Sequence, residues 1–103
     1  MSRLLPRKTC LHLVVKASES ALEGCRSQFD EGDAVLFLDD GVVHVLDLAG
    51  GTQPLPLSAC RFSAEDLEAR GLSGVAAAAG ARALPGVEAA ALLLGHDLCV
   101  TWK

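Results

Sequence analysis

The sequence predicts a small three-layer α/β fold, in which a mainly parallel sheet carries helices on both faces. Continuous apolar runs alternate with helical segments along the chain. An apolar run without polar alternation is typical of a strand buried on both faces, and strands that alternate with helices favour a parallel sheet. The chain has 103 residues, the length of one domain, so residues 1–103 are expected to form a single core.

Four apolar segments are predicted as strands. They are residues 10–15 (CLHLVV), 34–38 (AVLFL), 55–62 (LPLSACRF) and 97–102 (DLCVTW). The segment 42–51 (VVHVLDLAGG) stays open between two interpretations. Its β-branched residues favour a strand, but a short helix after the preceding Asp-Gly turn would also pack.

The first helix is predicted to begin at Ser20. Ser20 and Glu23 have the spacing of a capping box, in which each satisfies a free backbone N–H at the helix start. The helix is expected to end at residues 31–33, where Gly32 suits a left-handed cap.

The clearest helix of the chain spans residues 63–72 (SAEDLEARGL), with its first serine as the cap and Gly71 placed just after its end. Residues 74–84 are predicted to form a loop that leads into a strand. The last helix is expected to have Pro85 at its first position and to stop at Gly95.

Composition argues against several classes of function. The formal net charge is −4 and basic residues do not cluster, so no direct contact with nucleic acid is expected. The apolar runs are short or interrupted by charge, so neither a signal peptide nor a membrane helix is predicted, and the protein is expected to be cytoplasmic. Cysteines and histidines lack the local pairing of a zinc site, and no phosphate-binding loop is present. No metal or cofactor is therefore expected.

Reactive groups in a parallel sheet gather at the carboxyl ends of the strands, here near residues 16–18, 39–41 and 61–63. Asp39 and Asp40 are interpreted as turn residues rather than as a carboxylate pair. Adjacent side chains on an extended chain point to opposite sides, and Asp and Gly favour turns.

The three histidines have structural interpretations. His12 is expected to be a hydrogen-bonded core residue of its strand. His44 is expected to be exposed near the sheet end, without a partner nucleophile. His96 follows a helix stop, where a cation interacts favourably with the helix dipole.

Cys25 is the candidate reactive residue. Helical spacing places Leu22, Cys25 and Phe29 on one face, which favours packing against the sheet. Gly24 costs about 1 kcal/mol relative to alanine inside a helix, so it indicates a close approach by another part of the chain. Arg26 would favour the thiolate, the nucleophilic form of the thiol. Packing and reactivity both stay open.

Several blocks of the sequence resemble the TusB/DsrH family of sulfur-relay subunits. They are LHLVVK (11–16), EGDAVLFLDDGV (31–42), EDLEARGL (65–72) and the closing His96-Asp97 with Trp102. The resemblance implies a fold of the DsrE/F/H type, which agrees with the pattern of strands and helices.

The resemblance also implies a non-autonomous subunit of a sulfurtransferase complex, without a complete active site of its own. Its partners would be two homologous subunits (TusC/TusD-like or DsrF/DsrE-like), in a dimer of trimers, and a small sulfur acceptor (TusE/DsrC-like). The favoured endpoint is 2-thiolation of the tRNA wobble uridine; the alternative is dissimilatory sulfur oxidation. An isolated subunit is expected to be able to self-associate through the surface meant for its homologues.

The resemblance gives Cys25 a candidate role as persulfide carrier. Subunits of the sulfur-oxidation branch that resemble this chain carry a cysteine six residues before a Glu-Gly pair, and Cys25 has that spacing to Glu31-Gly32. The tRNA branch often has an apolar residue there. Two alternatives remain: a purely structural subunit with a buried Cys25, and a small-ligand-binding domain with a pocket at the strand ends.

Overall fold

The computed structural model describes residues 9–52 and 55–103. The strands are β1 (Cys10–Val14), β2 (Ala34–Phe37), β3 (Cys60–Ser63), β4 (Ala83–Leu84) and β5 (Leu98–Trp102). The helices are α1 (Glu19–Gln28), α2 (Val45–Ala49), α3 (Ala64–Ala69), α4 (Ser73–Ala79) and α5 (Gly86–Leu94), with 3-10 helices η1 (Asp39–His44) and η2 (Leu57–Ala59). The strands form one sheet in the order β4-β3-β2-β1-β5, and every pairing is parallel.

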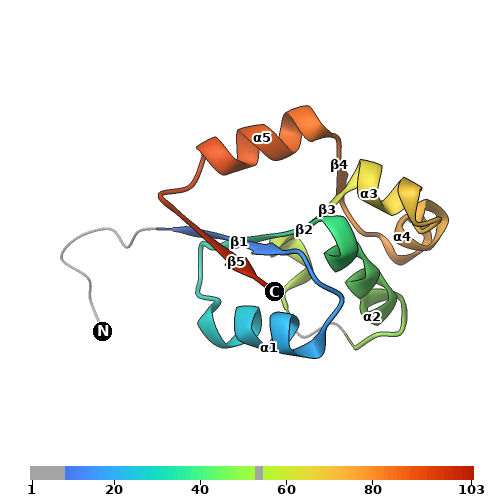
Figure 1. Cartoon of the computed structure of the whole chain (residues 1–103), viewed down its shortest axis with the longest axis horizontal. Helices are drawn as coiled ribbons and strands as arrows, with labels where there is room; N and C mark the ends of the chain where they lie inside the picture. The colour runs from blue at the N-terminus through green and yellow to red at the C-terminus, as the bar shows by residue number, and fades with distance from the viewer. Residues whose placement is uncertain (1–8, 53–54) are drawn as a thin grey trace.

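The sheet lies between two layers of helices, which confirms the predicted three-layer α/β fold. Figure 1 shows α1 and α2 on one side of the sheet and α5 on the other. The main core fills the α1 and α2 side, where Val14, Phe37 and Phe62 lie beside one another in register. Leu11 and Leu36 are also buried, and alternation along the strands directs them to the opposite face. Within the described residues, no helix is long and apolar enough to cross a membrane.

Helix α1 begins earlier than predicted. Its N-cap is Ser18, whose hydroxyl accepts a hydrogen bond from the Ala21 N–H at 3.2 Å. The predicted capping box at Ser20 is wrong, because Glu23 pairs with Arg26 one turn further on instead of folding back onto the helix start.

Two further boundaries differ from the prediction. Helix α1 ends at Gln28 and Phe29 continues in an extended conformation, so Gly32, with φ +90°, shapes the following turn instead of capping the helix. Residues 74–84, predicted as a loop, contain most of α4. A run of alanines has the highest intrinsic helix propensity, and Gly80, with φ +76°, ends the helix.

The open segment 42–51 is helical, since it holds the end of η1 and all of α2. The third strand begins only at Cys60, because Pro56 leads first into η2. Pro85 is the N-cap of α5 and not its first helical residue, whereas the predicted stop at Gly95 is confirmed.

The helix predicted most clearly, α3, forms as expected. Ser63 caps it by accepting a hydrogen bond from the Asp66 N–H at 3.3 Å. At the other end Gly71 has φ +69°, and the Leu72 N–H donates to the Leu67 carbonyl at 2.8 Å. This is the Schellman pattern that a glycine just after a helix favours.

Candidate functional site

Cys25 lies on the inner face of α1 and is fully buried. Ala21 and Leu22 of the same helix are buried with it, and all three belong to the main core. Burial raises the pKa of the Cys25 thiol to about 12, with smaller contributions from Cys60 and other neighbours. In this conformation the thiol is protonated at neutral pH and packs as a small apolar group.

Arg26 does not activate the Cys25 thiol. Its guanidinium lies on the exposed side of α1, where it pairs with Glu23. The expectation that Arg26 favours the Cys25 thiolate is therefore wrong for this chain by itself, because neighbouring residues of a helix point in different directions.

Gly24 marks the close approach that the sequence indicates. A Cβ atom at this position would lie 2.8 Å from the indole ring of Trp102 on β5. The glycine therefore lets α1 sit against the last strand of the sheet, with the indole between them.

The buried polar centre of the molecule joins His12, Asp33 and Trp102. The Trp102 indole N–H donates to Nδ1 of His12 at 3.0 Å, so the other ring nitrogen, Nε2, carries the hydrogen and donates to Asp33 Oδ2 at 2.9 Å. Asp33 also accepts hydrogen bonds from the backbone N–H groups of Cys10 and Asp30, both at 3.0 Å. The prediction of a hydrogen-bonded core histidine is confirmed for His12, which is buried.

A cavity of about 300 Å³ opens beside this network at the β5 edge of the sheet. Its lining residues are Cys10, His12, Gln28, Asp33, Leu98, Val100 and Trp102. Both ring nitrogens of His12 are already hydrogen-bonded within the protein. The network therefore holds β1, β5 and the loop before β2 together, and it presents no free base to the cavity.

A second cavity, of about 520 Å³, bears on the ligand-binding alternative. Its lining residues are Glu19, Ser20, Leu22, Glu23, Asp47 and Thr52. Three of these side chains are carboxylates and none is basic, so the cavity does not suit a phosphate or another anion.

The other two histidines lie at helix ends. His44 is buried, so the expectation of an exposed histidine is wrong. Its Nε2 lies 3.0 Å from the Lys16 carbonyl oxygen and its Nδ1 lies 3.2 Å from Asp47 Oδ2. His96 Nδ1 lies 2.9 Å from the Leu92 carbonyl oxygen, at the end of α5, as its position after the helix stop predicts.

The four cysteines divide by exposure. Cys10, Cys25 and Cys60 are buried, and burial raises the pKa of the Cys60 thiol to about 11. Cys99 on β5 is exposed. The sequence does not single out Cys99 as an exposed thiol. Its exposure depends on the position of β5 at an edge of the sheet, which the pattern of strands and helices does not predict. Within the described residues, no group of three or more His, Cys, Asp or Glu side chains could hold a metal ion.

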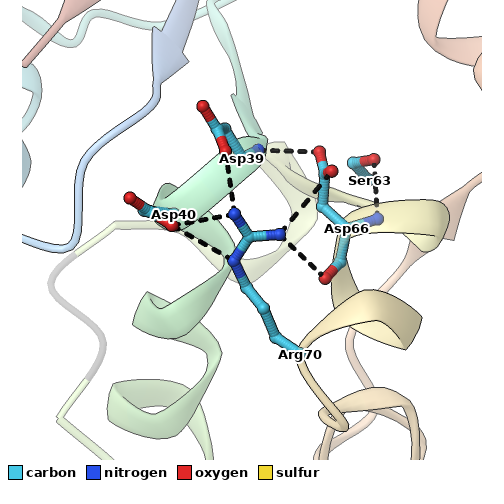
Figure 2. A network of polar contacts seen from close by, with 5 residues as sticks. All are labelled: Asp39, Asp40, Ser63, Asp66 and Arg70. Atoms are coloured by element: carbon cyan, nitrogen blue, oxygen red, sulfur yellow. Dashed lines mark hydrogen bonds and ion pairs between the residues drawn. The ribbon is translucent and has the colours of Figure 1, made fainter.

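Asp39 and Asp40 converge on one guanidinium at the carboxyl end of β2, as Figure 2 shows. Arg70 donates to Asp39 Oδ1 and to Asp40 Oδ1, each at 2.8 Å. Asp39 has φ +53°, and its N–H donates to Asp66 Oδ2 at 2.7 Å. The prediction that the two carboxylates diverge is wrong, because they begin a 3-10 helix and not an extended segment. The cluster fastens η1 to α3.

Replacing Arg70 with methionine is expected to lower the melting temperature at neutral pH by a few degrees. The hydrogen bond from Arg70 lowers the pKa of the Asp40 carboxyl below its ordinary value. A lowered pKa in the folded state stabilises the protein above the unfolded pKa, about 3.9, and this effect is lost as the pH falls through the folded value. The difference between wild type and Arg70→Met in thermal melts should therefore shrink below about pH 4. The Arg70→Lys variant keeps the charge but not the forked geometry. Its melting temperature at neutral pH should lie between those of the wild type and Arg70→Met. A difference that is constant from neutral to acid pH would contradict the cluster's role.

Comparison with known proteins gives one family. A family model described as "DsrH like protein" matches residues 16–96, which is most of the chain. No curated protein matches the sequence. The family match confirms the resemblance in the blocks around Asp33 and α3, and it includes Cys25 but neither His12 nor Trp102.

Proposed function

The chain belongs to the DsrH-like family of sulfur-relay subunits, and from this premise we propose that it works in a cytoplasmic hetero-oligomer that passes persulfide sulfur towards 2-thiolation of the tRNA wobble uridine. Its partners would be two homologous subunits and a small sulfur-acceptor protein. The family match over residues 16–96 is the observation that carries this proposal. Dissimilatory sulfur oxidation is the alternative pathway.

The surface of α5 supports a role as one part of a larger assembly. This helix consists almost entirely of apolar residues, yet none of them is buried, and Val87 and Leu94 are 83% and 90% exposed. An exposed apolar face of this kind marks an interaction site in many proteins. We assign α5 to the contact with a homologous subunit.

The burial of Cys25 supports a second form of the proposal, in which this subunit completes the assembly without carrying sulfur. In a carrier role, the Cys25 thiolate would attack the outer sulfur of a donor persulfide. A new S–S bond would form on Cys25 and the donor would leave as a thiolate. This step needs α1 to move away from the sheet, because the thiol is fully buried and its pKa is raised.

Intact-mass measurement after incubation with a persulfidated donor protein separates the two forms. A gain of one sulfur that Cys25→Ser abolishes and Cys99→Ser retains would establish the carrier role. A gain that depends on Cys99, or no gain while a homologous partner is labelled, would overturn it and leave the structural subunit.

Nucleoside composition of tRNA tests the pathway. Deleting the gene in its own organism is expected to deplete 2-thiouridine derivatives in hydrolysed tRNA, as measured by mass spectrometry. Re-expression of the wild-type chain should restore them. Unchanged 2-thiouridine would overturn the tRNA endpoint and favour the sulfur-oxidation alternative.

A further inference from the structure

Among residues 9–52 and 55–103, no strand pairs with the outer edge of β5, and we propose that this edge pairs with the same edge of a second copy of this chain, in an antiparallel register centred on Val100. β5 is the last strand of the sheet and has β1 as its neighbour. Its residues are mostly exposed, with Leu98 at 49% and Val100 at 37%. An apolar edge strand without proline or internal charge is a template for pairing with another chain.

The backbone of β5 shows which of its groups face the open edge. The Leu98 N–H donates to the Thr9 carbonyl at 3.1 Å, and the Trp102 carbonyl accepts from the Val15 N–H at 3.2 Å. Backbone groups of successive strand residues point to alternate sides, so residues with even numbers face β1. The N–H and C=O groups of Cys99 and Thr101 therefore face outward.

The residues that flank β5 select the register. Asp97 precedes the strand and Lys103 follows it, each three residues from Val100. In an antiparallel pair centred on Val100, Asp97 of each copy lies opposite Lys103 of the other copy. The strand pair therefore contains two such pairs of opposite charges. Cys99 lies opposite Thr101 in the same way, and all these positions face outward, as hydrogen-bonded pairs require. A shift of this register by two residues in either direction leaves both Asp97 and Lys103 without an opposite charge across the pair.

This symmetry identifies a second copy as the occupant of the edge. The charge pattern of β5 is complementary to itself when the strand is reversed, and opposite charges across a strand pair are stabilising whereas like charges are not. The other edge of the sheet, β4, has only two residues and offers little for pairing. The pairing involves only β5 and the two charged residues that flank it. It does not depend on the sulfur-relay proposal, and the same dimer is expected if the chain carries no sulfur.

Disulfide trapping tests the register directly in the full chain. In a Cys99→Ser background, Val100→Cys places two thiols opposite each other, with Cα atoms about 4.5 Å apart, within the range of a disulfide. The matched control is Leu98→Cys in the same background. It lies on the same face of the strand, but its two copies would be about 14 Å apart. Mild oxidation should give a covalent dimer for Val100→Cys and at least tenfold less for Leu98→Cys. Equal trapping, or none, would overturn the register.

Charge reversal tests the pairing with all native cysteines present. Sedimentation should show a concentration-dependent dimer whose dissociation constant rises about tenfold in Lys103→Asp, because two attractive pairs become repulsive. Lys103→Asp is the first choice because Asp97 also accepts a hydrogen bond from the Thr9 N–H. The double variant Asp97→Lys/Lys103→Asp should recover the dimer. A dimer that resists Lys103→Asp but is abolished by Leu94→Glu would place the contact on α5 and overturn the proposal, as would a monomer at every concentration.

Discussion

Replacing Gly41 with alanine is expected to lower the free energy of unfolding by at least about 3 kcal/mol. A Cβ atom at this position would lie 1.9 Å from the Val14 carbonyl oxygen and 2.6 Å from its carbonyl carbon. Neither atom is free to move, because both belong to the backbone of β1 and the same oxygen accepts a hydrogen bond from the Leu38 N–H. The melting temperature should fall by roughly 12 °C or more.

Gly74→Ala is the matched control for Gly41→Ala. Gly74 lies inside α4, and a Cβ atom there would meet nothing within 4 Å. Alanine in place of glycine should stabilise this helix by up to about 1 kcal/mol. Thermal and urea unfolding of both variants would measure the contrast. A Gly41→Ala protein as stable as the wild type would show that η1 does not lie against the end of β1.

The Asp-Asp-Gly segment shows how far sequence reasoning reaches. Turn propensity places the segment at the carboxyl end of a strand, and that prediction is confirmed. Propensity does not show that Gly41 touches Val14, or that Asp39 and Asp40 meet Arg70, which lies thirty residues further along the chain. Those contacts depend on the direction in which the chain leaves the strand, and that direction is set by tertiary packing.

The neighbourhood of Cys25 was predictable only in part. Periodicity correctly places Leu22 and Cys25 on the buried face of α1, and the cost of Gly24 correctly indicates a close neighbour. That the neighbour is Trp102 follows from the position of β5 beside β1, and alternation of strands and helices leaves the strand order open. For the same reason the sequence predicts His12 as a hydrogen-bonded core residue but does not identify its partners, Asp33 and Trp102. The alanine run in α4 is a simpler failure, because its helix propensity was visible in the sequence.

Replacing Asp33 with alanine is expected to cost about 3 kcal/mol of stability. The carboxylate is fully buried and accepts hydrogen bonds from the Cys10 N–H, the Asp30 N–H and His12 Nε2. Its loss takes the carboxylate acceptor away from two buried donors, the Cys10 N–H and the His12 Nε2–H, and the loss of such a hydrogen bond at a buried donor costs about 1–3 kcal/mol. Urea unfolding would measure the effect. Glu68→Ala, which removes an exposed carboxylate, controls for the change in net charge and should be nearly neutral.

Asp33→Asn tests whether the network is held in one hydrogen-bonding arrangement. The new amide has two orientations. With its oxygen on the Cys10 N–H, its NH₂ group faces the Asp30 N–H and the His12 Nε2–H; with its oxygen on those two donors, its NH₂ group faces the Cys10 N–H, so either orientation sets a donor against a buried donor. In the first orientation His12 cannot relieve the conflict by moving its hydrogen to Nδ1, because that nitrogen already accepts from the Trp102 indole. The expected cost is therefore about 2 kcal/mol.

Trp102→Phe removes the donor that fixes the His12 tautomer. In that background His12 can carry its hydrogen on Nδ1 and accept from the new amide with Nε2. The amide oxygen then serves the buried Cys10 N–H and only the part-buried Asp30 N–H faces the NH₂ group, so Asp33→Asn should cost about 1 kcal/mol less than it does in the wild type. Unfolding of the two single variants and the double variant gives this coupling directly. Strict additivity would show that Trp102 does not set the tautomer. Coupling of the expected sign would show that Trp102 fixes the position of the hydrogen on the His12 ring. Through that ring, it would determine which hydrogen bond His12 makes with residue 33.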